Sequence, residues 1–336
     1  MPTIKDVALA AGCSTATVSR ALAAPEKVTE ATRQRVAAAI AQVGYSPNVA
    51  ARNLRRSESK TIVVLLPDIA NPFFSEIIAG LEEVAHRAGY QVLLGDCEND
   101  ASRARGYFDL LPTNQADGII LMTTEVPRSL VQDRQASNNF PLVMACEYFD
   151  GLALPTVCID NRLAAEKAVE YLLSLGHQRI ATITGPRNNP ICRDRILGYT
   201  SELERAGYPA PADWIAEGDF SFLAGYQQGR ALLDRPEATR PTAVFCHSDE
   251  MAIGLLKAAR DLNVQVPTEL SVIGFDNIGF SEYCEPELTT ISQPRDDIGR
   301  SAMRLLLDIL AKKQVPLQQT LTTQLIVRDS TARCAQ

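Results

Sequence analysis

The sequence contains few of the residues on which most catalytic and metal sites depend. It has only three histidines, and none of them has the spacing of a metal-ligand pair. It contains neither a GxxxxGKS/T phosphate-binding loop nor a GxGxxG dinucleotide motif. These absences argue against a metalloenzyme or a nucleotide-dependent enzyme. We therefore expect a protein that is not an enzyme and that carries no metal or cofactor.

Long apolar runs and paired cysteines are also missing. No run reaches the roughly 18 apolar residues of a membrane helix, and Met1 to Asp6 lack the apolar core of a secretion signal. The eight cysteines lie far apart without a CxxC pair, which favours reduced, buried thiols. We expect a cytoplasmic protein. With 336 residues, 46% apolar and 22% charged, the chain is typical of about two globular domains, or three with a small one.

Charge is distributed unevenly along the chain. Residues 1–60 contain nine Lys and Arg against four Asp and Glu, whereas the remainder contains 24 against 36. A small basic segment joined to a large acidic body is typical of a nucleic-acid-binding module attached to another domain. A basic surface without any partner would show the same charge, so the motifs must decide.

The basic segment predicts three short helices. Thr3 and Asp6 have the spacing of a capping box for the first helix, and Gly12 ends it. Ser14 can cap the second helix, Thr15 to Leu22. The third helix, EATRQRVAAAIAQV, follows Thr29 and stops at Gly44. The residues expected to face inward are Val7, Ala8, Ala11, Val18, Leu22, Val36, Ala39, Ile40 and Val43. Two helices joined by a tight glycine turn form a helix-turn-helix.

The second helix is predicted to enter the major groove of DNA. Thr15, Ala16 and Arg20 would project from its exposed face, where small side chains let the helix approach the bases. An arginine there can donate two hydrogen bonds to a guanine. Short hydroxyl side chains suited to phosphate oxygens are Ser14, Thr17 and Ser19. A three-helix bundle for protein contacts is the alternative.

A further short helix is expected in the segment YSPNVAARNLRRSESK. Asn48 can cap a helix that runs to Arg56, which is shorter than the ~12–15 residues that an isolated helix needs in water. Leu54 stands among arginines, either as a minor core contact or as a wedge between base steps. The residues of this segment expected to contact DNA are Asn48, Ala51, Arg52, Leu54 and Arg55.

From Lys60 onward, short β-branched runs alternate with helix-length segments, as in a parallel sheet with crossover helices. An internal repeat with an offset of 118 residues relates Ile62 to Ile180 and the run from Arg87 to Tyr90 to the run from Arg205 to Tyr208. The predicted fold class is therefore α/β. An all-α helix-turn-helix head with a hinge helix precedes a doubly wound body of two lobes.

A cleft between two such lobes is expected to bind a small molecule at the carboxyl ends of the strands. The run from Cys246 to Asp249 contains nucleophile, base and acid types, but neighbouring residues at a strand end point to opposite sides and cannot form a triad. The predicted ligand contacts are Phe73, Phe74, Glu147, Arg195, Phe220, Ser248, Asp249, Asp276 and Gln293. The alternatives are core packing for the two adjacent phenylalanines, a solvated loop carboxylate for Glu147 and a local ion pair for Arg195.

The segment TIKDVALAAGCSTATVSRALAAPEKVTEATRQRVAAAIAQVGYSPNVAARNL resembles the head of the lactose/galactose repressor family, and the resemblance continues along the chain. It implies a homodimer whose recognition helices read two half-sites of a pseudo-palindromic operator. It also implies that paired hinge helices fold in the minor groove, with Leu54 as the intercalating leucine. The body would be periplasmic-binding-protein-like, with Arg195, Phe220 and Asp276 contacting the effector.

The resemblance also suggests domain boundaries. We expect a helix-turn-helix domain at 1–46, a hinge helix and linker at 47–60, and an effector-binding and dimerisation domain at 61–336. Three crossings, near Asp160, Gln293 and Leu321, would divide this last domain into lobe 1 (about 61–160 and 293–320) and lobe 2 (about 161–292 and 321–336).

Several segments, among them PDIANPFFSEII, PTAVFCHSD, VIGFDNI and PRDDIGR, are similar to nucleoside-responsive members of the family. This resemblance implies a nucleoside effector such as cytidine, because aromatic rings hold a flat base while carboxylates and a glutamine hold ribose hydroxyls. A sugar needs the same polar groups, so a sugar-responsive regulator of the family is one alternative. The other is a small-molecule binding protein that does not act on DNA, which the helix-turn-helix disfavours.

Overall fold

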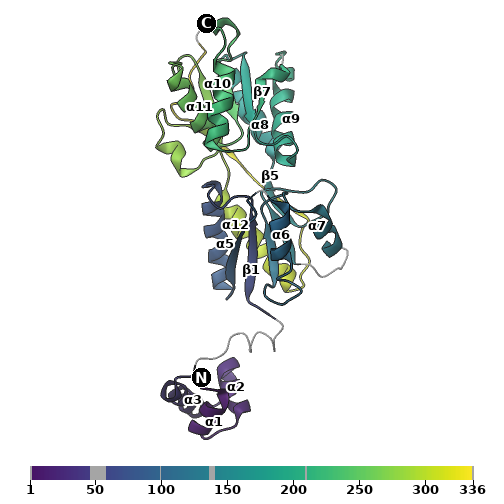
Figure 1. Ribbon diagram of the computed structural model, residues 1–336, viewed down its shortest axis with the longest axis vertical. Helices are drawn as coiled ribbons and strands as arrows, with labels where there is room; N and C mark the ends of the chain where they lie inside the picture. Colours follow the sequence, from purple (N-terminus) through teal and green to yellow (C-terminus); the bar gives the residue numbers. More distant parts are fainter. Residues whose placement is uncertain (1, 46–57, 99, 136–140, 209, 335–336) are drawn as a thin grey trace. The chain divides into compact units, whose positions relative to one another are not determined.

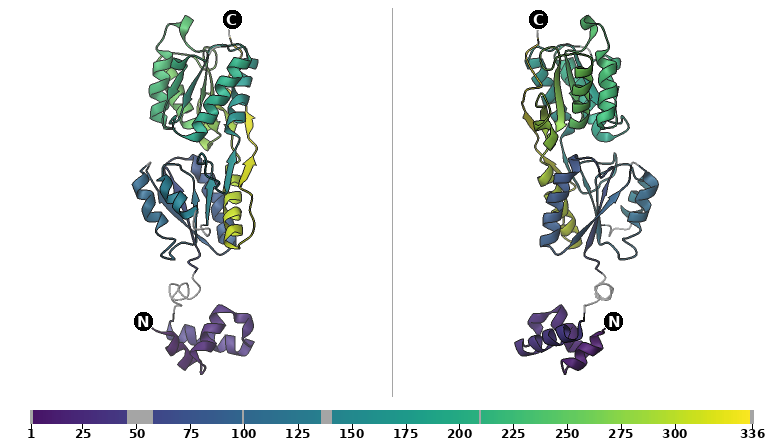
Figure 2. Two further views of the ribbon diagram at one scale, coloured as in Figure 1. Left: turned by 90° about the vertical axis from the view of Figure 1, so that its right-hand side faces the viewer. Right: turned by 60° about the vertical axis from the view of Figure 1, so that its left-hand side comes forward.

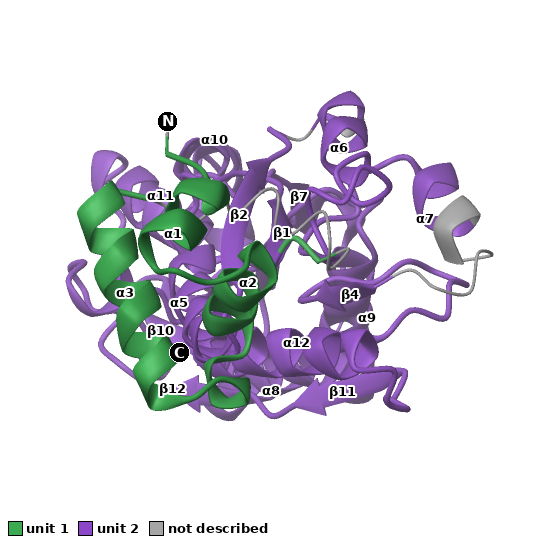
Figure 3. Cartoon of the chain, turned by 90° about the horizontal axis from the view of Figure 1, so that it is seen from below, with its two compact units in different colours: residues 1–59 green, residues 60–336 purple. Residues whose placement is uncertain are grey.

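A computed structural model describes residues 2–45, 58–98, 100–135, 141–208 and 210–334. The chain divides into two compact units, residues 1–59 and 60–336, which Figure 3 shows in different colours. Within the described residues, no helix combines the length and the hydropathy that crossing a membrane requires.

The first unit contains the three predicted α-helices in its described part. They are α1 (Ile4–Ala10), α2 (Thr15–Ala23) and α3 (Glu30–Val43), with a 3₁₀ turn, η1 (Pro25–Lys27), before the third. The predicted caps are confirmed. The Asp6 carboxylate accepts hydrogen bonds from the backbone N–H and the hydroxyl of Thr3, and Ser14 Oγ accepts from the backbone N–H of Thr17 at 3.1 Å. Gly44 ends α3 in the left-handed conformation, with a φ of 66°.

The core of this unit is small and consists mainly of valine and alanine, as predicted, but one residue differs. Leu22 is 38% exposed, and Ala21 is buried in its place. Val18 and Ala21 lie three residues apart on one face of α2, and the short alanine side chain lets this helix pack closely. Ile40 and Val43 are only half-buried.

The second unit is α/β, and its described part contains two six-stranded sheets (Figure 1). The sheet of lobe 1 has the order β11-β5-β4-β3-β1-β2, and that of lobe 2 has the order β12-β10-β9-β8-β6-β7. The lobe 1 strands are β1 (Thr61–Leu66), β2 (Gln91–Asp96), β3 (Gly118–Leu121), β4 (Leu142–Ala145), β5 (Thr156–Ile159) and β11 (Gln318–Leu321). The lobe 2 strands are β6 (Ile180–Thr184), β7 (Ile215–Glu217), β8 (Ala243–Cys246), β9 (Ser271–Asp276), β10 (Thr289–Ser292) and β12 (Gln324–Ile326).

Helices cover both faces of each sheet, which is why the central strands are buried along their whole length. Lobe 1 has α5 (Phe73–Arg87), α6 (Ala101–Phe108), α7 (Arg128–Gln135) and α12 (Arg295–Leu310). Lobe 2 has α8 (Asn161–Ser174), α9 (Pro190–Arg205), α10 (Phe222–Leu233) and α11 (Asp249–Asp261), with 3₁₀ turns η2 (Ala212–Trp214), η3 (Glu237–Thr239) and η4 (Gly279–Glu282). The doubly wound class is confirmed.

The internal repeat appears as matching strands and helices in the two lobes, because the offset of 118 places β1 on β6 and α5 on α9. It also places Gly80 on Gly198. A Cβ atom at Gly80 would lie 2.3 Å from the backbone oxygen of Asp296 in α12, and one at Gly198 would lie 2.4 Å from that of Arg162 in α8. Both glycines therefore permit the close approach of a neighbouring helix.

The chain passes between the two sheets three times. It leaves lobe 1 between β5 and α8 at Asp160, returns between β10 and α12 at Gln293, and leaves again between β11 and β12. The last two strands lie at one edge of each sheet, and Figure 2 shows them as a yellow segment that runs from lobe 1 into lobe 2. The carboxyl ends of the parallel strands of both lobes face the cleft between these crossings.

Candidate functional site

The exposed face of α2 in the first unit is a candidate nucleic-acid interface. Thr15, Ala16 and Arg20 are exposed and, together with Ser19 and Lys27, line a shallow open groove. The hydroxyls of Ser14 and Thr17 lie 2.8 Å apart, so one of them donates a hydrogen bond to the other. The hydroxyl that accepts keeps its own proton free to donate to a phosphate oxygen. The predicted contacts in the hinge, Asn48, Ala51, Arg52, Leu54 and Arg55, lie outside the described residues.

The effector site predicted for the second unit corresponds to a cavity of about 340 Å³ between the lobes. Its walls are formed where β1, β3 and β4 of lobe 1 and β6, β8 and β9 of lobe 2 end. The predicted residues that line it are Phe73, Phe74, Glu147, Arg195, Phe220, Ser248, Asp276 and Gln293. The structure thus brings together every predicted contact except Asp249.

Arg195 lines this cavity, is only 3% exposed, and makes several contacts with neighbouring residues. Its Nε donates to Asn161 Oδ1 at 2.8 Å, its Nη1 donates to the backbone oxygen of His247 at 2.6 Å, and its guanidinium carbon lies 3.7 Å from the centre of the Phe275 ring. Burial lowers the pKa of Arg195, and the nearby carboxylate of Asp276 opposes this effect. These contacts are with an asparagine, a backbone oxygen and a phenylalanine ring, and not with a neighbouring aspartate as the ion-pair alternative required.

Asp276 lies at the end of β9 with a φ of 108°, a strained conformation for a residue other than glycine. Its Oδ1 accepts a hydrogen bond from Nε2 of Gln293 at 2.7 Å. Burial raises the pKa of the Asp276 carboxyl to about 7, although Arg195 acts in the opposite direction. At neutral pH this carboxyl can therefore either accept or donate a hydrogen bond to a ligand.

Glu147 is a buried carboxylate, so the solvated-loop alternative is wrong. Its Oε2 accepts from the backbone N–H of Thr124 at 2.7 Å, and its Oε1 accepts from Nδ2 of Asn189 at 2.8 Å. Burial raises the pKa of Glu147, while these two hydrogen bonds lower it. Asn189 caps α9 and lines the cavity, but it was not among the predicted contacts. Its signal in the sequence is the Asn-Pro pair that often begins a helix.

Phe220 provides an aromatic wall of the cavity. Its φ is 71°, and its ring covers Gly185, where a Cβ atom would lie 2.2 Å from Phe220 Cζ. Ser248 Oγ donates to the backbone oxygen of Phe220 at 3.3 Å and accepts from the backbone N–H of Met251 at 3.2 Å. Ser248 thus caps α11 and fixes the Phe220 loop at the same time.

The adjacent phenylalanines at the start of α5 form an edge-to-face pair with ring centres 5.0 Å apart. Phe74 is buried and belongs to the hydrophobic core as well as to the cavity wall. Phe73 is half-buried and also lines the cavity. The two interpretations of this pair, core and ligand contact, are therefore both consistent with its position.

Asp249 lies away from the cavity, contrary to prediction. Its Oδ2 accepts from the backbone N–H of Ile278 at 2.8 Å, and its Oδ1 accepts from the hydroxyl of Thr290 at 2.6 Å. As the first residue of α11, it points back over β9, where it lies against Gly274. It joins the helix to the sheet, and burial raises the pKa of its carboxyl well above the ordinary range.

Two family models match the chain. The model of bacterial regulatory proteins of the lacI family matches residues 3–48, and that of the periplasmic binding protein-like domain matches residues 169–331. The HTH-type transcriptional repressor CytR of Escherichia coli strain K12 is 49% identical over 330 residues, which are 98% of this chain and 96% of that protein. The HTH-type transcriptional repressor PurR of Shigella sonnei is 36% identical over 335 residues, 99% of this chain and 97% of that protein.

Solved structures are similar over the same length. The lac repressor dimer bound to operator and the anti-inducer ONPF has a TM-score of 0.88 and 29% identity, covering 98% of this chain and 99% of that one. A complex of the transcriptional regulator CelR with cellobiose has a TM-score of 0.75 and 30% identity, covering 98% of this chain and 100% of that one. The chain therefore belongs to the lacI family of bacterial regulatory proteins and is a DNA-binding transcriptional repressor that responds to a small-molecule effector.

Proposed function

We propose that the effector of this repressor is a nucleoside, with cytidine as the first candidate. The observation that carries the proposal is the combination of an aromatic wall and a group of polar side chains in one cavity. The ring of Phe220 offers a flat face to a nucleobase, while Asp276, Gln293 and Arg195 offer acceptors and donors to ribose hydroxyls. The segments that resemble nucleoside-responsive members of the family, together with the 49% identity to the repressor CytR over nearly the whole chain, support this class of effector.

We also propose that the repressor acts in the cytoplasm as a homodimer on a pseudo-palindromic operator. The similar lac repressor is a dimer in its solved complex with operator, which supports this assembly. Residues 1–46 would form the DNA-binding domain, 47–60 the hinge and 61–336 the effector-binding and dimerisation domain. Thr15, Ala16 and Arg20 would contact bases, and Ser14, Thr17 and Ser19 would contact phosphates.

The first experiment is a thermal-shift screen of the full-length protein with cytidine, adenosine, uridine, free bases, ribose and cellobiose. A ligand that binds only the folded state raises the melting temperature. We expect a shift with at least one nucleoside and a smaller one with ribose. If only sugars shift the transition, the effector is a sugar and the nucleoside proposal is wrong, while the family assignment is unaffected.

The second experiment places the ligand in the cavity. Phe220→Leu removes the aromatic face but retains an apolar side chain, so it should weaken nucleoside binding by about 1 kcal/mol and leave operator binding without ligand unchanged. Phe222→Leu is the matched control, because Phe222 is an exposed residue just outside the cavity. Equal nucleoside affinities of the two variants would contradict the placement.

A further inference from the structure

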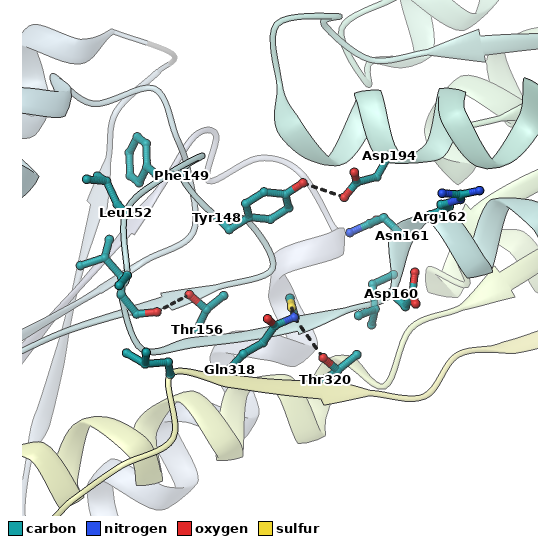
Figure 4. A pocket seen from close by; sticks show the side chains of 15 residues that line it. Tyr148, Phe149, Leu152, Thr156, Asp160, Asn161, Arg162, Asp194, Gln318 and Thr320 are labelled. Atoms are coloured by element: carbon teal, nitrogen blue, oxygen red, sulfur yellow. Dashed lines mark hydrogen bonds between the residues drawn. The ribbon is translucent and has the colours of Figure 1, made fainter.

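A second cavity, of about 480 Å³, lies at the joint between the lobes and is separate from the effector cavity. Its floor is formed by β5 and β11, and its walls by the loop that follows β4 and by the beginnings of α8 and α9. Figure 4 shows its side chains. No residue lines both cavities, but Tyr148, which lines this one, directly follows Glu147, which lines the effector cavity (Figure 4 shows Tyr148).

The polar end of this cavity contains a buried amide that faces inward. Asn161 is only 3% exposed, and its Oδ1 accepts from Arg195 Nε. Its Nδ2 is turned toward Tyr148 and Asp194 in Figure 4 and has no hydrogen-bond partner among the described residues. Tyr148 itself donates its hydroxyl proton to Asp194 at 2.7 Å. A ligand at this end would therefore find an unused N–H donor.

Two carboxylates stand at the same end without a basic partner. Asp160 accepts from the backbone N–H of Leu163 and Asp194 accepts from Tyr148, but in the described part of the chain neither forms an ion pair. The one basic residue of the lining, Arg162, is paired with Glu166 at 2.9 Å. This end of the cavity thus has a negative charge that favours a cationic group.

The opposite end is apolar. Leu152 and Phe149 lie there, as Figure 4 shows, and Leu154 and Leu317 complete the surface. Phe149 and Leu154 are buried, whereas Leu317 is 58% exposed. Apolar surface at one end and uncompensated carboxylates at the other match an amphiphilic molecule with one charged end.

We infer that this cavity is a second small-molecule site, which binds an amino alcohol with an apolar body. The ammonium group would bind between Asp160 and Asp194, the hydroxyl oxygen would accept from Asn161 Nδ2, and the apolar body would contact Phe149 and Leu152. Because Asn161 also holds Arg195, the occupied site would restrain a residue of the effector cavity.

The probe for the test is 2-amino-1-phenylethanol, which has all three features. Its matched analogues are 1-phenyl-1,2-ethanediol, which lacks the charge, and 2-phenylethylamine, which lacks the hydroxyl. Isothermal titration of the full-length protein should show binding of the probe and at least about tenfold weaker binding of the diol, since the charged hydrogen bonds are the stronger ones. Equal binding of the diol and the probe would overturn the proposal, as would no binding of the probe up to about 10 mM.

A double variant, compared with a matched double control, tests the two carboxylates. Asp160→Asn with Asp194→Asn removes both charges but keeps the oxygens that accept from Leu163 and Tyr148, and asparagine is also a good helix cap. We expect at least about tenfold loss of affinity for the probe. The control is Asp213→Asn with Asp308→Asn, two aspartates outside the cavity whose replacement changes the net charge equally. Unchanged affinity in the first variant would overturn the proposal.

A last variant separates the two cavities. Phe220→Leu alters only the wall of the effector cavity, so it should leave the affinity for the amino alcohol within about twofold of the wild type. A large loss in this variant would show that the probe occupies the effector cavity instead, and the second site would then be rejected. This test measures only the affinity for the amino alcohol, so its result does not depend on which effector the repressor recognises.

Discussion

Asn189 donates a 2.8 Å hydrogen bond to Glu147 and thereby joins lobe 2 to lobe 1 across the wall of the effector cavity. Both residues are buried, and both line the cavity. A buried carboxylate that loses a donor incurs a desolvation cost, so this bond favours the arrangement of the lobes in which it forms. A ligand that binds between the lobes can also favour one arrangement of the lobes over another. It does so only to the extent that it binds one arrangement more tightly.

Asn189→Ser should weaken effector binding. Serine still caps α9 but is too short to reach Glu147, so the variant removes the cross-lobe bond without removing the cap. We expect a loss of about 1–3 kcal/mol in effector affinity, measured by calorimetry. Asn188→Ser is the control, because the neighbouring asparagine is exposed and lies outside the cavity. The same affinity in both variants would show that the bond does not support the bound arrangement.

Asp276→Asn should change how stability depends on pH. Burial raises the pKa of this carboxyl from 3.8 to about 7 in the folded protein, so the native state holds a proton that the unfolded state has lost between these values. Its contribution to stability is therefore complete below about pH 4 and is lost as the pH rises toward 7. The variant should remove a slope on the order of 1 kcal/mol per pH unit from the free energy of unfolding in this window.

Urea unfolding at several pH values measures this slope. Glu250, whose pKa is also raised to about 7 by burial, contributes in the same direction and remains in the variant, so the slope should decrease without vanishing. Asp219→Asn is the control, since Asp219 also lines the cavity but is exposed. A slope that is identical in wild type and Asp276→Asn would mean that this carboxyl is ionised throughout.

Gly80→Ala and Gly198→Ala should each destabilise the second unit. The added methyl group would overlap a backbone oxygen of the neighbouring helix at 2.3 or 2.4 Å, and backbone cannot move aside as a flexible side chain can. We expect a cost of about 1–3 kcal/mol in the free energy of unfolding for each. Gly106→Ala in α6 is the control, because nothing lies within 4 Å of a Cβ there, and alanine should stabilise that helix by up to about 1 kcal/mol.

Arg20→Ala should relax the sequence preference of the repressor at one base pair of each half-site. A bidentate contact to guanine provides about 1–3 kcal/mol of discrimination, whereas a phosphate contact weakens all sequences alike. Selection of binding sites from a random DNA library measures this preference. Arg33→Ala, which removes an arginine paired with Glu30 on α3, should leave it unchanged. An unchanged preference for Arg20→Ala would exclude its role in base recognition.

The cavity residues were predictable wherever the topology alone determined their position. Parallel strands end at one edge of a sheet, so residues at or just after the ends of strands, such as Glu147, Asp276 and Gln293, are expected to converge, and the structure brings them together. Asn189 could not be found in this way, because its role depends on how one lobe meets the other. The sequence offers only a helix cap at this position.

The wrong predictions have a different origin, because they concern the direction of side chains. Asp249 follows a strand, as the other candidates do, but the first turn of α11 directs its carboxylate into the sheet. Leu22 is larger and more apolar than Ala21, yet close helix packing selects the smaller side chain for the core. Periodicity gives the face of an element to within about one residue, which is too coarse to separate such neighbours.

The strands β11 and β12 have a consequence for the integrity of the whole body. Only Thr322 and Thr323 separate them, and each strand completes the edge of a different sheet. A premature stop codon or a protease cut shortly before Gln318 would therefore strip an edge strand from both lobes at once. The loss of these two strands would impair both lobes together. We therefore expect cells to degrade such shortened proteins rather than retain a half-functional repressor.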